Sequence, residues 1–513
     1  MSDAKTFAAD LLTARRTTID PSEPSRGPGT GQNADDVFAD VRESLDAIEA
    51  LRATDPAEAL EVFRRLLDDR KLTDADLTSY IDVWRTAIDT PHEFEAKARI
   101  PSTRGVDDWW DNLRAYLHRP AEPSADDAAR LELLATRYVV PKHDLAPPIN
   151  PHERTLETYD PAWAPLLKAK IAESSWPKGL VEMPRHDAAH PYVYEATDER
   201  GAPIPAGRPI DIGFLADFGS GYYHSWGIAE QLAAWAFPYV FHLGDVYYAG
   251  RRAEFMRRFE QPLFDVVEKS RLFGLPENHE LYGGGQHYLD YFRNLRLRGR
   301  TPQEGSYFCV RFPEHQIIGI DVNWQRRQHY QDEKLAQWLR ARLDEADGRT
   351  NILLSGSAPF DYGAVDPRPL LGELWPFLSD GTIPLWFWGD DHYCALFERN
   401  EDVPFYGCCI GHGGYPGAIQ PDSLGSFRTS PVWWESEPRF PRWIGLRPDV
   451  TNNGWCHATL QPGGGVDLTF VDWLWCKRAS VSFTKTGAKL ERGAVREFER
   501  ENIPAIHRPK EKP

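Results

Sequence analysis

Four apolar runs, each followed by a turn that carries Asp, Asn or His, constrain the fold of this 513-residue chain most strongly. The polar residues of these turns are, in chain order, Asp217, Asp245, Asn278 and His392. Loops at the carboxyl ends of strands in a layered α/β sheet converge on one crevice, so we expect these four side chains to lie together. Oxygen and imidazole donors gathered in one place are what a metal site requires.

Four short motifs contain these residues, and a fifth follows them: DFGSG at 217–221, HLGDVYY at 242–248, NHELYGG at 278–284, WFWGDDH at 386–392 and then IGHGG at 410–414. In this order they resemble the calcineurin-like metallophosphoesterase superfamily, in particular a purple-acid-phosphatase-like bacterial branch, over about residues 208–472. The resemblance implies a four-layer α/β/β/α sandwich. It also implies that a metal-bound hydroxide hydrolyses a phosphomonoester or phosphodiester.

The resemblance implies these metal ligands: Asp217, Asp245, Tyr248, Asn278, Asp390 and His392. Asp245 would bridge two cations. His279 would lie beside the phosphate as a general acid or as an oxyanion stabiliser. For Tyr248, packing in the core is the alternative, and the adjacent Tyr247 competes for the ligand role. The two aspartates could instead cap strand ends by accepting hydrogen bonds from loop amides.

The chain departs from the superfamily pattern around the second metal. Ser355-Gly356-Ser357 stands where the family branch has two histidines, Asp390 replaces a histidine, and Glu277 replaces a glycine. A second site made nearly all of oxygen would favour hard cations such as Mg²⁺, Mn²⁺ or Ca²⁺ over Zn²⁺, or it would be empty. We therefore expect one or two divalent cations (Mn, Mg, Fe or Zn). The alternative function is a catalytically weakened pseudo-phosphatase that binds a metal or ligand.

Composition excludes several classes of partner. The net charge of −18 argues against non-specific binding to nucleic acid or to an anionic membrane, although a phosphorylated small molecule remains compatible. The six cysteines form no C-x-x-C pair, which argues against a zinc ribbon. With no visible secretory signal and no apolar stretch of about 18 residues or more, we expect a cytoplasmic location and no membrane span.

The sequence pattern predicts this division of the chain: a disordered N-terminus (1–34), an all-α domain (35–140), a Pro-rich connector (141–205), the α/β domain (206–490) with an insertion (421–453), and a charged tail (491–513). Asp55, Pro56 and Glu58 form a helix-start signal in the all-α domain. The aromatic residues of that domain form its core or bind a protein partner. The arginines and tryptophans of the insertion form a lid over the phosphate, or a surface loop that covers sheet edges.

Overall fold

The computed structural model describes residues 45–66, parts of 73–85, and 184–499 apart from these gaps: 221–222, 248–249, 251–254, 283, 295–301, 323–332, 361–367, 416–428, 430, 439–450 and 488. The chain divides into two compact units. One comprises Met1–Leu180 and Trp443–Val450, and the other comprises Val181–Arg442 and Thr451–Pro513. The four strand-end residues that the sequence singles out all lie in the second unit.

Helices make up the described part of the first unit. Helix α3 (Pro56–Leu66) begins where the sequence predicts. The side chain of Asp55 accepts a hydrogen bond from the Glu58 amide at 3.1 Å, which satisfies one of the amides that a helix start leaves unpaired. An ion pair of 2.6 Å joins Arg52 to Asp74. The remainder of the predicted all-α domain and residues 141–183 of the predicted connector lie outside the described residues. The described end of the connector contains strand β1 (Val193–Glu195), which pairs with β5 (Phe308–Arg311) in the second unit.

Two sheets form the second unit. Within the described residues, sheet 1 runs in the order β1 (Val193–Glu195), β5 (Phe308–Arg311), β6 (His315–Ile320), β7 (Thr350–Ser355), β8 (Leu385–Trp388), β10 (Tyr406–Ile410), β9 (Cys394–Phe397) and β11 (Pro431–Trp434). Strands β6, β7, β8 and β10 are parallel. Strands β5 and β6 form the antiparallel hairpin that the sequence predicts.

Sheet 2 runs in the order β15 (Lys489–Arg492), β14 (Lys477–Thr486), β13 (Val466–Asp472), β12 (Gly454–Leu460), β2 (Ile210–Leu215), β3 (Tyr239–His242) and β4 (Arg271–Gly274), with β16 (Arg496–Glu497) paired to β14. Strands β2, β3 and β4 are parallel, so their carboxyl ends meet at one edge. The turns after these three strands carry the predicted acidic and amide residues.

The main hydrophobic core lies between the two sheets. Phe214 of β2 stacks on Phe387 of β8 with ring centroids 4.6 Å apart, and Trp433 of β11 stacks on Phe470 of β13 at 4.8 Å. Each fully buried aromatic side chain contributes about 1.5–3 kcal/mol through removal of apolar surface from water. The core therefore holds the end of β8 against the end of β2, although the two strands belong to different sheets.

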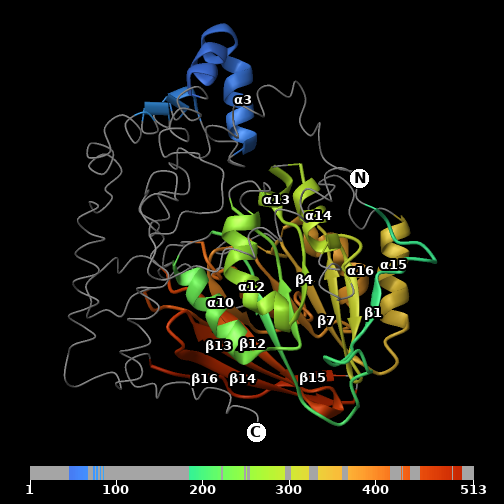
Figure 1. Ribbon diagram of the computed structural model, residues 1–513. Coiled ribbons are helices and arrows are strands. Elements are labelled where there is room, and N and C mark those ends of the chain that lie inside the picture. Colours follow the sequence, from blue (N-terminus) through green and yellow to red (C-terminus); the bar gives the residue numbers. More distant parts are fainter. Residues whose placement is uncertain are drawn as a thin grey trace, which may run out of the picture. The chain divides into compact units, whose positions relative to one another are not determined.

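Helices cover the outer face of each sheet (Figure 1). On sheet 1, α15 (Glu333–Asp344) and α16 (Pro369–Leu378) bury apolar residues such as Leu339 and Leu374. The helices on the outer face of sheet 2 are α10 (Tyr223–Trp235), the π-helix η1 (Phe255–Glu260), α12 (Gln261–Lys269), α13 (Asn278–Tyr282) and α14 (Gln286–Asn294). The indole N–H of Trp455 in β12 donates to Gln231 of α10 at 2.8 Å. The second unit is thus an α/β/β/α sandwich, as the sequence predicts.

The described part of the insertion extends sheet 1. Residues Pro431–Trp434 form edge strand β11, and Trp433 is buried against sheet 2. In this part the insertion forms a strand at the edge of sheet 1. The arginines of the insertion lie outside the described residues. Among the described helices, none combines the length and the hydropathy that crossing a bilayer requires.

Candidate metal centre

Asp217 and Asp245 stand in strained turns at the ends of β2 and β3. Their φ angles are 56° and 75°, in the left-handed region that non-glycine residues rarely adopt. The Asp217 amide donates to the carbonyl of Gly244 at 2.9 Å, which links the two turns. Gly244 has a φ of 108°, and a Cβ at this position would lie 2.6 Å from Cβ of Glu277. Strain of this kind costs about 1–3 kcal/mol per residue and gathers at functional sites.

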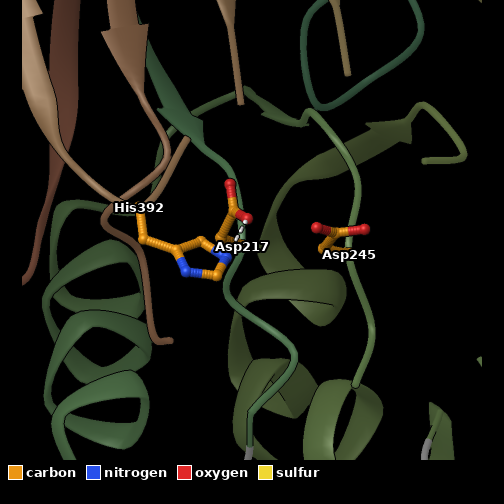
Figure 2. Close-up of side chains that lie close together, drawn as sticks. All are labelled: Asp217, Asp245 and His392. Atoms are coloured by element: carbon orange, nitrogen blue, oxygen red, sulfur yellow. Dashed lines mark ion pairs between the residues drawn. The ribbon is translucent and has the colours of Figure 1, made fainter. Parts of the chain in front are cut away.

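Asp217, Asp245 and His392 form one cluster, called the Asp217 cluster below. Each offers one ligand atom, and the three atoms lie within 4.8 Å of one another. Figure 2 shows the three side chains reaching toward one another from separate segments of the chain. Nε2 of His392 lies 3.3 Å from Oδ1 of Asp217. The two carboxylates are buried, so water does little to stabilise their charges.

Negative charge accumulates around this cluster. Burial, and then the charges of Asp217, Glu280 and Glu277, raise the pKa of Asp245 well above its ordinary value. Glu277 and Glu280 are themselves buried. Carboxylates that repel one another in a medium of low dielectric are stabilised by a bound cation, which would be the largest charge in the site.

Tyr247 places its hydroxyl among all three members of the cluster. The hydroxyl oxygen lies 2.7 Å from Oδ1 of Asp217, 3.2 Å from Oδ2 of Asp245 and 2.9 Å from Nε2 of His392. The side chain is fully buried. Tyr248, the tyrosine that the motif spacing favours as a ligand, lies outside the described residues. The competing alternative, Tyr247, is the tyrosine that the structure places at the cluster.

Asn278 and His279 follow β4 and begin α13. The side-chain oxygen of Asn278 is buried and has no hydrogen-bond partner within the described part of the chain. The backbone N–H of His279 approaches Oδ1 of Asp245 at 3.4 Å, and its ring lies 4.3 Å from the ring of Tyr247. A buried amide oxygen that lacks a donor is what a cation would satisfy.

Glu280 connects the turn at Asp245 to the turn at Glu277, a role that the sequence did not predict. Its carboxylate accepts hydrogen bonds from the amides of Asp245 at 3.2 Å, Val246 at 2.8 Å and Glu277 at 2.8 Å. Burial raises the pKa of Glu280 to about 7, although these amides act in the opposite direction. The only sequence signal for this role is that Glu280 directly follows Asn278 and His279. Its position does not show which backbone amides its carboxylate binds.

The substituted positions have taken other partners. The hydroxyl of Ser357 donates to Oε1 of Glu277 at 2.6 Å. A Cβ on Gly356 would lie 3.1 Å from Cβ of Glu277, so the small residue leaves room for the glutamate. The carboxylate of Asp390 forms an ion pair of 2.8 Å with Arg368, while its backbone N–H donates to Oδ2 of Asp217 at 3.0 Å. Asp390 is thus near the cluster, but its side-chain charge is compensated by an arginine.

Three other histidines near the motifs are buried. His242 packs against Phe259 at 4.6 Å, and burial lowers its pKa to about 3. Burial lowers the pKa of His412 to about 4, and its carbonyl accepts the Gly454 amide at 2.9 Å. The ring of His224 contacts the carbonyl of Gly414. None of these imidazoles belongs to the metal-ligand cluster found among the described residues.

The donor set fits a divalent cation. Two carboxylates, an imidazole and a phenol lie together and supply oxygen and nitrogen ligands of the kinds that Mn²⁺, Fe²⁺ and Zn²⁺ accept. The buried amide oxygen of Asn278 and the crowding of negative charge at Asp245 are the two observations in favour. Metal binding by Asp217, Asp245, Asn278 and His392 remains a prediction.

No family model and no curated protein matches the chain. Among solved structures, it is similar to the purple acid phosphatase PPD1 isolated from yellow lupin (Lupinus luteus) seeds, with 12% identity and a TM-score of 0.41 over 53% of this chain. The aligned part spans about half the length of that phosphatase, 53%. GAP50, the anchor in the inner membrane complex of Plasmodium, is also similar, with 12% identity and a TM-score of 0.39 over 58% of this chain and 91% of its own.

Proposed function

We propose that this chain is a metal-dependent phosphoesterase that hydrolyses a phosphomonoester or a phosphodiester at the Asp217 cluster. The convergence of two buried carboxylates and one imidazole, with the Tyr247 hydroxyl between them, is the observation that carries the proposal. A site of this composition has few structural uses, because the buried charges destabilise the protein unless a cation offsets them.

Asp217, Asp245 and His392 would hold the cation, with Tyr247 and Asn278 as further ligands. A divalent cation in this place supplies Lewis acidity toward a phosphoryl oxygen and lowers the pKa of water. The two carboxylates balance its charge. The Tyr247 hydroxyl contacts Asp217, Asp245 and His392, so it helps to fix their mutual distances even before the cation binds.

His279 is the proposed catalytic residue. It directly follows Asn278, its amide approaches Asp245, and its ring packs on Tyr247, so it lies beside the proposed cation. In this position the imidazolium would donate a proton to the leaving oxygen of the ester or stabilise negative charge on the phosphoryl group. Either role places a phosphorylated small molecule against His279 as the substrate.

A second candidate is a metal-binding protein without turnover. The ion pair between Arg368 and Asp390 and the hydrogen bond between Ser357 and Glu277 favour it. Both pairs engage residues at positions where the superfamily binds a second cation. With one cation, part of the charge neutralisation in the transition state would be lost, and about 1.4 kcal/mol already corresponds to tenfold in rate.

Metal analysis combined with a hydrolysis assay separates the two candidates. The purified chain is assayed on p-nitrophenyl phosphate and bis(p-nitrophenyl) phosphate with Mn²⁺, Mg²⁺, Zn²⁺ and Fe²⁺. We expect turnover that His279→Asn lowers about 10²–10⁴-fold in kcat while the affinity for Mn²⁺ stays unchanged. The exposed His190→Asn serves as the matched control and should retain full activity. Tight Mn²⁺ binding without turnover of either ester would establish the second candidate.

We also propose a cytoplasmic location, as the sequence predicts. All six cysteines are free, which fits a reducing compartment. Five of them are buried, and burial raises the pKa of the Cys309 thiol to about 12, which protects it from oxidation.

A further inference from the structure

The loop at 389–393 delivers His392 to the Asp217 cluster and contains two successive acids. Asp390 has a φ of 66°, so the loop turns sharply through a strained residue. The side chains of Asp390 and Asp391 are only 22% and 16% exposed. The carboxylates of Asp390 and Asp391 would repel the negative charge of the Asp217 cluster. The loop therefore needs a positively charged partner that offsets this repulsion.

Arg368 is that partner. Its Nη1 lies 2.8 Å from Oδ2 of Asp390 and its Nη2 lies 3.0 Å from Oδ1 of Asp391, so one guanidinium spans both acids. A planar group with two donors in fixed relation sets the direction of its acceptors as well as their charge. Arg368 therefore orients the loop, and its effect goes beyond neutralising the two carboxylates.

Arg368 itself is firmly anchored. Its backbone N–H donates to the carbonyl of Pro359 at 3.2 Å, and its carbonyl accepts the Leu371 amide at 3.1 Å. It caps the start of α16 in an extended conformation, and Pro369 follows as the first helical residue. Helix α16 is fixed on sheet 1 by buried residues such as Leu371. The guanidinium thus projects from a rigid base.

The other side of the loop rests on Asp217. The Asp390 amide donates to Oδ2 of Asp217 at 3.0 Å, and the Gly389 amide donates to the carbonyl of Gly356 at 2.9 Å. With Oδ2 engaged by the loop, Oδ1 of Asp217 faces Tyr247 and His392. The position of the loop thus determines which oxygen of Asp217 is presented to the cluster.

We propose that Arg368 is a positioning residue of the metal centre, which fixes the loop at 389–393 through Asp390 and Asp391 and thereby aligns His392 and Asp217 for one cation. The same contacts hold both loop carboxylates away from the cation. This inference rests on the proposed metal centre and assigns to Arg368 a role that the motifs do not contain. Residues that orient metal ligands typically contribute about 10–100-fold to metal affinity.

Calorimetric titration of the full chain with Mn²⁺ tests the inference. We expect Arg368→Gln to weaken Mn²⁺ binding about 10–100-fold. We expect Arg368→Lys to be intermediate, because a single ammonium cannot span both carboxylates. The matched control is Arg311→Gln on β5, which removes ion pairs with Glu345 and Glu195 and should leave Mn²⁺ affinity unchanged. Unfolding in EDTA checks that each variant is folded.

The direction of the change separates the explanations. Unchanged Mn²⁺ affinity in folded Arg368→Gln would overturn the inference. A tighter Mn²⁺ affinity would also overturn it, because the arginine would then only repel the cation by its charge. If Arg368→Gln does not fold, Asp391→Asn, which removes one of the two contacts, must show the weaker binding instead. Absence of Mn²⁺ binding by the unaltered chain would overturn the proposed function itself, a result distinct from unaltered affinity in the variants.

Discussion

Asp245→Asn should stabilise the metal-free protein while greatly reducing its stabilisation by metal. Asp245 is buried beside Asp217, Glu277 and Glu280, and its Oδ2 lies 3.2 Å from the hydroxyl of Tyr247. Asparagine has nearly the same shape and keeps one oxygen acceptor, but it carries no charge. The substitution therefore removes the repulsion and leaves the packing in place.

The sign of the effect follows from the raised pKa of Asp245. Between its ordinary pKa and the higher folded value, the native state holds a proton that the unfolded state has released. The free energy of unfolding of the metal-free protein therefore falls as pH rises through this interval. Asp245→Asn eliminates this loss, so in EDTA at neutral pH the variant should unfold at a higher temperature than the unaltered chain.

In the presence of Mn²⁺, the unaltered chain should unfold at a higher temperature than Asp245→Asn. At a concentration of Mn²⁺ about 100 times Kd, the unaltered chain gains about 2.7 kcal/mol. For a unit of more than 300 residues this gain corresponds to roughly 4 °C in Tm. If the loss of one carboxylate weakens binding about 100-fold, the variant gains only about 0.4 kcal/mol at the same concentration.

Thermal unfolding in EDTA and in Mn²⁺ measures both effects on the same two proteins. Equal Mn²⁺-induced shifts in the variant and the unaltered chain would show that Asp245 is no ligand. A metal-free variant that is less stable than the unaltered chain would refute the charge argument.

Two further predictions concern groups with known partners. Tyr247→Phe removes a hydroxyl that contacts the buried carboxylate of Asp217 at 2.7 Å. It should lower the free energy of unfolding in EDTA by about 1.5–3 kcal/mol, which a urea titration measures. An unchanged urea midpoint would show that the hydroxyl does not make this contact. His315 is buried with its ring 2.8 Å from the carbonyl of Gly465, and burial lowers its pKa to about 4 from 6.5. Below pH 6.5 the unfolded chain binds the extra proton, so stability should fall by up to about 3 kcal/mol as pH decreases toward 4, and His315→Gln should show a shallower slope in the same titration.

The fold was predictable because apolar runs of strand length end in turns with few alternative conformations. The alternation of these runs with amphipathic segments such as 333–344 leaves a layered α/β sandwich as the natural arrangement. The side chains of Asp217, Asp245 and His392 lie together because two of them end parallel neighbouring strands, and the core holds the third against them.

Side-chain contacts between segments that lie far apart in the chain could not be predicted from the sequence. Tyr247 and Tyr248 are adjacent in the sequence, and the pattern does not show that the Tyr247 hydroxyl lies 2.7 Å from Oδ1 of Asp217, 30 residues earlier. Arg368 lies 22 residues before Asp390, and no periodicity connects them. Pairings of this kind depend on how separate elements pack, which local propensity does not encode.

The central claim is that one cation binds between Asp217, Asp245 and His392. Anomalous X-ray scattering from crystals grown in Mn²⁺ tests it most directly. We predict one strong peak about 2.0–2.3 Å from Oδ1 of Asp217, Oδ2 of Asp245 and Nε2 of His392. A peak bound by other residues, or no peak at a saturating concentration of Mn²⁺, would contradict it.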